Sequence, residues 1–271
     1  MNNKGMLAVG ELGKKLAETG RLKLRPLCVY GTDEIPGGAV PSYNIDRCIA
    51  KAAYTAAIID DTPPVYIEAG HEQCCAGGLL WMGFAEPHPK LKYFVTVGTP
   101  DFRGGVAEHL KSTPELFDEQ RERAGIITPP GRYIVISPCT DDIAPESIRS
   151  LILFAGAEQI RNLCGLAQFS NSDPFFRTLI PAGATCTMMV TFPAGMAGHA
   201  PKDSAYVGPT DPTGNIWLPA DLLIMGIPAA LACQMADDMD ESFIGKRGKV
   251  AYPQKRLEVG SKDNGCVNES I

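Results

Sequence analysis

The stretch VGTPDFRG at residues 97–104 is echoed by VGPTDPTG at residues 207–214, and the aspartates repeat at an offset of 211 − 101 = 110. Further along, IVISP at 134–138 is answered by LIMGIP at 223–228, where the proline offset is 228 − 138 = 90. The first half therefore carries about 20 additional residues, roughly one helix and a turn. We expect two similar halves from an internal duplication, related by a pseudo-twofold axis. Clefts between such halves are common ligand sites.

Short apolar runs alternate with helical patterns along the chain. Residues 27–30 and 152–156 predict corresponding buried strands, followed by helices at 45–59 and about 157–169. The remaining expected elements are strands at 65–67, 93–97 and 222–225 and helices at 6–19, 76–84, 115–123 and 228–241. This alternation predicts an α/β or α+β fold, with mixed sheets and flanking helices. The expected organisation is an N-terminal helical arm (1–23), a first half (24–145), a second half (146–245) and a polar C-terminal tail (246–271).

Composition excludes several classes of protein. The chain has 271 residues, of which 45% are hydrophobic and 21% charged, and its net charge is −6. No apolar run is long enough to span a bilayer, and no basic stretch indicates nucleic-acid binding. The first residues lack the pattern of a secretory signal, and nine irregularly spaced cysteines are typical of a reducing compartment. We therefore expect a cytoplasmic protein with no nucleic-acid or membrane partner, and the sequence leaves a homo-oligomer open.

The densest group of reactive side chains is GHEQCCAGG at residues 70–78. Gly77 and Gly78 would let a ligand approach the backbone, and a helix beginning there would direct its N–H groups at a thiolate or anion. Such a setting lowers the pKa of a cysteine, so Cys75 is a candidate nucleophile, ahead of Cys74, with His71 as its base. The alternative is that both cysteines are buried core thiols beside small residues that allow close packing.

A metal site is a second interpretation. Cys48, Cys75 and Cys186 could converge if the two halves face each other, and soft thiolates favour an iron–sulfur cluster, zinc or copper(I). The adjacent Cys74 and Cys75 would supply at most one ligand to a tetrahedral site. Against this interpretation, the chain contains no Cys-x-x-Cys pair.

Asp101 and Asp211 occupy equivalent places in the two echoed stretches. A twofold axis could bring them to one cleft as paired acid and base carboxylates. The turn-forming preference of Asp and Gly explains the same pattern without any function, and this second interpretation is favoured.

A family resemblance rests on RCI at 47–49, CAGG at 75–78, Glu158-Gln159, Cys186 and GIP at 226–228, in this order. The chain resembles the uncharacterised archaeal and bacterial family called domain of unknown function 169, over about residues 24–245. The resemblance implies no activity or substrate. It indicates the following candidate site residues: Cys48, Cys75, Gly77, Gly78, Gln159 and Cys186. The family pattern has a further cysteine near residues 208–211, where this chain reads GPTD.

Two classes of function remain. The first is a protein that binds a small molecule or cofactor between its halves, with Gly77, Gly78, Gln159, Asp101 and Asp211 at the site. The second is a cysteine-dependent, metal-dependent or iron–sulfur redox enzyme that uses Cys75. Neither dinucleotide nor P-loop fingerprints occur, so the cofactor stays unknown.

Overall fold

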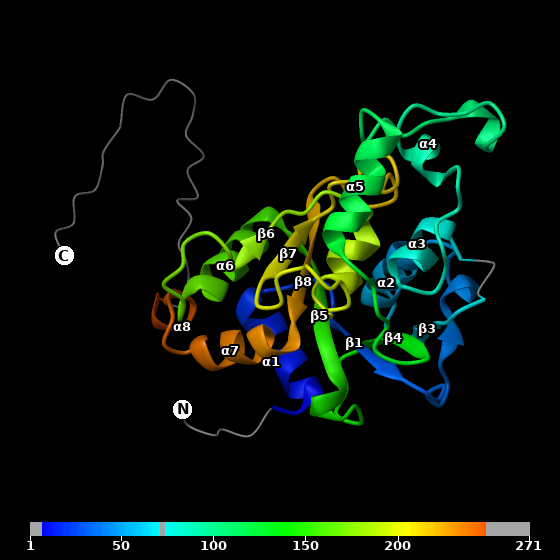
Figure 1. Cartoon of the computed structure of the whole chain (residues 1–271). Helices are drawn as coiled ribbons and strands as arrows, with labels where there is room; N and C mark the ends of the chain where they lie inside the picture. The colour runs from blue at the N-terminus through cyan, green and yellow to red at the C-terminus, as the bar shows by residue number, and fades with distance from the viewer. Residues whose placement is uncertain (1–6, 71–73, 248–271) are drawn as a thin grey trace, which may run out of the picture.

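The computed structural model describes residues 7–70 and 74–247 and places their strands in one eight-stranded sheet (Figure 1). The order across the sheet is β2-β3-β4-β1-β5-β8-β7-β6. The pairs β2/β3 and β6/β7 are parallel and the other described neighbours are antiparallel, so the sheet is mixed. The strands are β1 (Leu27–Thr32), β2 (Val40–Pro41), β3 (Val65–Ile67), β4 (Tyr133–Pro138), β5 (Ile148–Gly156), β6 (Thr178–Leu179), β7 (Ala205–Gly208) and β8 (Leu222–Pro228).

The two halves of the sheet have the same strand order. From the centre outward, the first half runs β1, β4, β3, β2 and the second runs β5, β8, β7, β6. In both, the outermost two strands are parallel, and β1 and β5 pair antiparallel at the centre of the sheet. The predicted α/β class and mixed sheet are confirmed, and the two halves share a single sheet.

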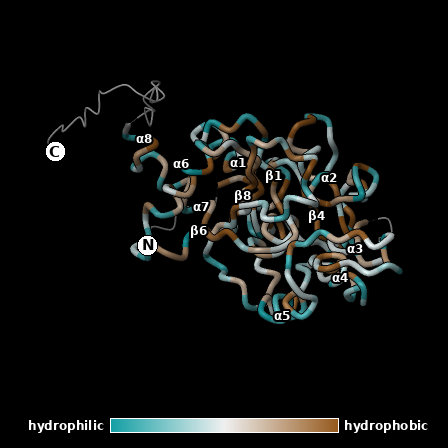
Figure 2. Tube along the Cα trace, turned by 90° about the horizontal axis from the view of Figure 1, so that it is seen from above, coloured by the Kyte–Doolittle hydropathy of each residue, from teal (hydrophilic) through white to brown (hydrophobic). Residues whose placement is uncertain are grey.

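Helices cover both faces of the sheet, giving three layers. Figure 1 shows α1 (Val9–Gly20), α6 (Ala157–Gln168) and α7 (Ala229–Asp238) on one side, and α2 (Ile49–Ile58) and α3 (Ala76–Trp81) on the other. Seen from above, apolar segments occupy the centre and α5 (Pro114–Ala124) lies at the polar periphery (Figure 2). The short helices η1 (Ser42–Asn44), α4 (Leu91–Val95), η2 (Arg103–Gly105), η3 (Pro145–Ser147), η4 (Thr187–Thr191) and α8 (Phe243–Arg247) complete the fold.

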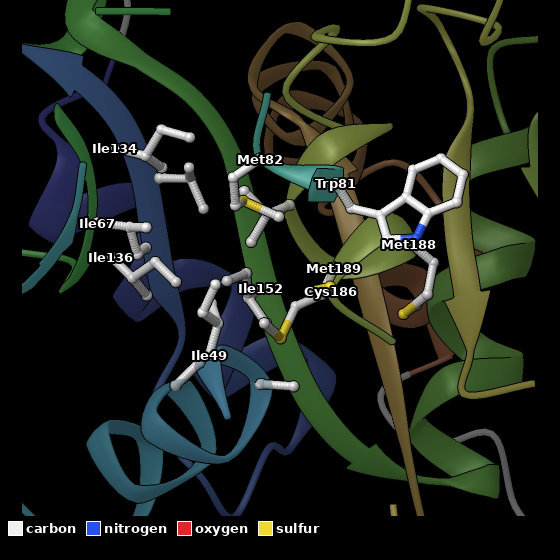
Figure 3. Packing of buried hydrophobic residues seen from close by; sticks show 14 of the residues in the cluster. Ile49, Ile67, Trp81, Met82, Ile134, Ile136, Ile152, Cys186, Met188 and Met189 are labelled. Carbon is white, nitrogen blue, oxygen red and sulfur yellow. The ribbon is translucent and has the colours of Figure 1, made fainter. Parts of the chain in front are cut away.

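The two cores follow from the alternation of side chains along the strands. In β5, Ile152 and Phe154 pack with α2, α3 and η4, whereas Leu151 and Leu153 pack with α1, α6 and α7. Successive side chains of a strand point to opposite faces, so a continuous apolar run supplies both cores. Figure 3 shows the first core, where isoleucines of the sheet and α2 face Met82, Met188, Met189 and Cys186.

A long insertion separates β3 from β4. We use this name for residues 84–130, which contain α4, η2 and α5. The helix expected at 115–123 is confirmed as α5, which begins with Pro114 and is capped by Thr113 Oγ1 accepting from the Leu116 N–H. The strand expected at 93–97 is wrong, because residues 91–95 form helix α4.

The physical reason for this correction is tertiary packing. Leu91, Phe94 and Val95 lie at helical spacing and pack with Leu80 and Phe117 in a small separate cluster. Burial of that stripe outweighs the strand preference of the β-branched and aromatic residues. Consequently Val97 follows a helix whereas Val207 lies in β7, and the opening sequence echo joins segments that differ in structure.

Within residues 7–70 and 74–247, no helix combines the length and apolarity needed to cross a membrane.

Candidate functional site

A cavity of about 310 Å³ lies between the beginnings of α2, α3 and η4 and the inner side of the insertion. Its volume is at the lower end of the range typical of small-molecule sites. Six residues singled out from the sequence line it: Cys48, Cys75, Gly77, Gly78, Cys186 and Asp211. They come from both halves of the chain.

Local hydrogen bonds bring the starts of α2 and α3 together. The backbone N–H of Cys75 donates to the Arg47 carbonyl at 3.0 Å, so the residue before α3 is tied to the chain that leads into α2. Asp46 accepts from the Cys48 N–H at 2.8 Å and forms an ion pair with Lys51. An acidic side chain before a helix satisfies one of its free N–H groups. Cys48 and Cys75 therefore stand at adjoining helix starts.

A glycine is required where the two helices meet. A Cβ atom on Gly78 would lie 2.8 Å from Cys75 Sγ and 2.8 Å from Ile49 Cδ1. Gly77 differs, because a Cβ there would meet no atom within 4 Å, and this residue borders open cavity. Two consecutive glycines thus serve different purposes, close packing and free space.

The second half contributes Cys186 and Asp211. Cys186 immediately precedes η4, and Thr191 at the end of η4 donates to the Trp81 carbonyl of α3 at 2.6 Å. Asp211 follows β7, and its carboxylate accepts from the Gly214 N–H at 2.9 Å and from Thr213 Oγ1 at 3.2 Å. This arrangement is the turn predicted for Asp211, and the same turn places the carboxylate at the cavity.

Burial dominates the chemistry of the three thiols. It raises the pKa of Cys48 and of Cys75, although backbone N–H groups at the helix starts act in the opposite direction. The pKa of Cys186 lies well above the usual value. Burial is the largest cause, and the negative charges of Cys75, Cys48 and Asp211 raise it further. The helix N-terminus was expected to lower the pKa of Cys75. Burial outweighs that effect, because loss of water disfavours the charged thiolate more strongly.

The thiol of Cys74, the residue before Cys75, lies in a different environment from the three cavity thiols. Cys74 is buried outside the cavity, and its sulfur lies 3.2 Å from Ser42 Oγ. His71, the proposed base, falls outside the described residues. In the described part of the chain, no histidine lines the cavity.

The remaining predicted residues lie elsewhere. Asp101 is an exposed residue of the insertion that pairs with Lys90 at 2.5 Å, and this lysine together with Thr99 lowers its pKa to about 2. It does not line the cavity with Asp211, so the structure does not bring together the two carboxylates of the less favoured interpretation. Gln159 lies in the first turn of α6, which covers the opposite face of the sheet.

Metal binding by Cys48, Cys75 and Cys186 stays a prediction. All three line one cavity, and the charge of a Cys75 thiolate would raise the pKa of both Cys48 and Cys186. Over residues 7–70 and 74–247, however, no three side chains of Cys, His, Asp or Glu are grouped closely enough to hold a metal ion.

Sequence reasoning missed the contribution of the insertion. Four of its nine residues at the cavity are the apolar stripe of α4 and Phe117 of α5, whose helical spacing was a usable signal. The further cavity residues are Ile49, Ala50, Trp81, Leu91, Phe94, Val95, Arg103, Glu108, Leu110, Lys111, Phe117, Gln120, Ala182, Gly183, Ala184, Thr185, Thr210, Gly214 and Asn215.

Comparison with protein families gives one match. The family model DUF169, described as "Uncharacterised ArCR", matches residues 15–238. The searches of curated proteins and of solved structures found no match. The matched range includes every described residue of the cavity, and the chain belongs to the DUF169 family.

Proposed function

We propose that this protein binds one small organic molecule in the cavity between its two halves. The observation that carries the proposal is the convergence of segments from the first half, the second half and the insertion on one cavity. Glycine at position 77 keeps part of that space empty. A protein core normally closes such volume, so an open cavity lined by several elements favours a ligand.

The walls indicate the kind of molecule. Trp81, Leu91, Phe94 and Phe117 supply flat apolar surface. Polar and charged side chains occupy a smaller part of the wall, and among them the buried hydroxyl of Thr185 has no hydrogen-bond partner in the described part of the chain. A mainly apolar pocket with a few polar groups that fix orientation is typical of small-molecule sites.

Filling the cavity should abolish this binding. We expect Gly77→Leu to weaken binding of the apolar fluorescent probe N-phenyl-1-naphthylamine at least tenfold, because the new side chain occupies ligand space without meeting other atoms near its Cβ. Fluorescence titration measures the affinity. Gly37→Leu is the matched control, since a Cβ at Gly37 also has no neighbour within 4 Å and the residue lies outside the cavity. Unsaturable binding in the wild type, or equal affinity in Gly77→Leu, would refute the proposal.

We further infer that the two halves derive from one duplicated unit. Their common strand order and pairing directions support this origin. Cys48 and Cys186 also correspond, since each immediately precedes a helix, α2 or η4, that lies between the second and third strands of its half. Cys75 and Asp211 both lie between the third and fourth strands. A pseudo-twofold axis would therefore relate Cys48 to Cys186, and Cys75 to Asp211, around the cavity.

The alternative function, thiol chemistry at Cys75, makes a different prediction. Because burial raises the pKa of Cys48, Cys75 and Cys186, we expect iodoacetamide to alkylate them slowly at pH 7 and faster as the pH rises through the raised pKa values. Peptide mass spectrometry reports the rate for each cysteine, and protein in urea provides the unfolded reference. Rapid alkylation of folded Cys75 at pH 7, ahead of N-acetylcysteine, would instead support a nucleophile.

A further inference from the structure

Two cations of the insertion, Arg103 and Lys111, line the cavity. Other lysines of this segment are paired, Lys90 with Asp101 and Lys92 with Asp118. In the described part of the chain, Arg103 and Lys111 form no ion pair, although both border the cavity. Positive groups beside an apolar pocket attract and orient an anion.

Arg103 is held in place by aromatic rings. Its guanidinium carbon lies 4.2 Å from the ring centre of Phe94 and 5.8 Å from that of Phe102. Such cation–π contacts fix the plane of the guanidinium and leave its N–H groups available. Phe94 is itself a wall of the cavity, so the cation lies directly beside the apolar surface.

Within the described residues, neither Asp211 nor Glu108 forms an ion pair with these cations, although the charge of Arg103 acts on Glu108. Asp211 is 9% exposed, and its Oδ1 accepts hydrogen bonds from the Gly214 N–H and from Thr213 Oγ1 of its own turn. Burial and then the nearby Asp211 raise the pKa of the half-buried Glu108, and the opposing effects of Arg103 and Thr213 on this pKa are smaller. The helix α2, which has 10 residues, also directs the positive end of its dipole toward this region.

We propose that the ligand is an amphipathic organic anion, whose apolar body packs against Trp81, Phe94 and Phe117 and whose acidic group is bound by Arg103 and Lys111. This inference rests on the proposed function, because it names the ligand class of the same cavity. Arg103 can hold two oxygens of a carboxylate or sulfonate with parallel hydrogen bonds, whereas Lys111 adds a point charge. An organic cation recognised by Glu108 and Asp211 is the competing outcome.

Two matched probes test the inference. 8-Anilino-1-naphthalenesulfonate and N-phenyl-1-naphthylamine share the same aromatic body, and only the first carries a sulfonate. We expect the wild type to bind the sulfonate at least tenfold more tightly than the neutral probe. The double variant Arg103→Gln/Lys111→Gln should lose this preference and bind the neutral probe within about twofold of the wild type. Lys90→Gln is the control, because this exposed cation of the insertion lies outside the cavity.

The outcomes separate the two proposals. If the neutral probe binds and Gly77→Leu weakens it, but the sulfonate gains nothing from Arg103 and Lys111, the cavity binds ligands and the anion inference is wrong. The anion inference is also wrong if the wild type binds the neutral probe or an organic cation more tightly than the sulfonate. If neither probe binds saturably, the proposed function itself fails. Loss of both probes in the double variant would assign the two cations a structural role and overturn the inference.

Discussion

Replacing Gly226 with alanine should lower the free energy of unfolding by about 3 kcal/mol, the upper part of the range for overpacked cores. Gly226 lies in β8 between Met225 and Ile227, both buried. A Cβ there would collide with the carbonyl oxygen of Met188, lie 2.7 Å from Pro193 Cγ and lie 3.2 Å from the Met189 carbonyl oxygen. Backbone atoms and a proline ring cannot rotate away, so the segment around η4 would have to move off the sheet.

Urea denaturation followed by tryptophan fluorescence measures this effect, with Trp81 close to the affected segment. The control is Gly37→Ala, whose added methyl group meets no atom within 4 Å and should change stability by less than about 0.5 kcal/mol. A loss below about 1 kcal/mol in Gly226→Ala would contradict the close contact between η4 and β8. Because Cys186 immediately precedes η4, we also expect weaker probe binding in any Gly226→Ala protein that remains folded.

Phe154→Ala should destabilise the protein by about 3–5 kcal/mol. Phe154 lies in the central strand β5 with 1% of its surface exposed. Its ring meets that of Tyr54 in α2 edge to face, with the centroids 5.3 Å apart. Truncation removes this contact and leaves a void under α2, and both effects favour unfolding.

The same denaturation experiment provides the measurement, and Phe175→Ala is the matched control. Phe175 is 75% exposed, so its truncation should cost less than about 0.5 kcal/mol. Phe154→Leu retains most of the apolar volume and should lie between the two. Equal stability of Phe154→Ala and Phe175→Ala would show that Phe154 is not packed between β5 and α2.

The sequence predicted the elements whose signals are local. The buried strand at 152–156, the strand at 222–225, helix α5 and the helix after Pro228 are all present. Their apolar runs, proline positions and caps act over a few residues, and these preferences agree with the final packing. The glycine pair after Cys75 was also recognisable, because small residues at a helix start indicate a close approach.

Tertiary packing alone decided that residues 91–95 form a helix. Their β-branched and aromatic side chains favour a strand, but packing on Phe117 and Leu80 makes them a helix. No sequence motif identifies the cations Arg103 and Lys111 as site residues either, because only the folding of the insertion across the cavity brings them to the site.

The sequence by itself determined the class of fold, the principal buried strands and the cysteine–glycine segment that became one wall of the cavity. Only the tertiary structure decided that Cys48, Cys75 and Cys186 share that cavity while Asp101 and Gln159 lie away from it. The physical reason is that helix and strand signals depend on neighbouring residues. A cavity, in contrast, depends on which faces of distant segments are buried against each other, as when Thr191 bonds to Trp81.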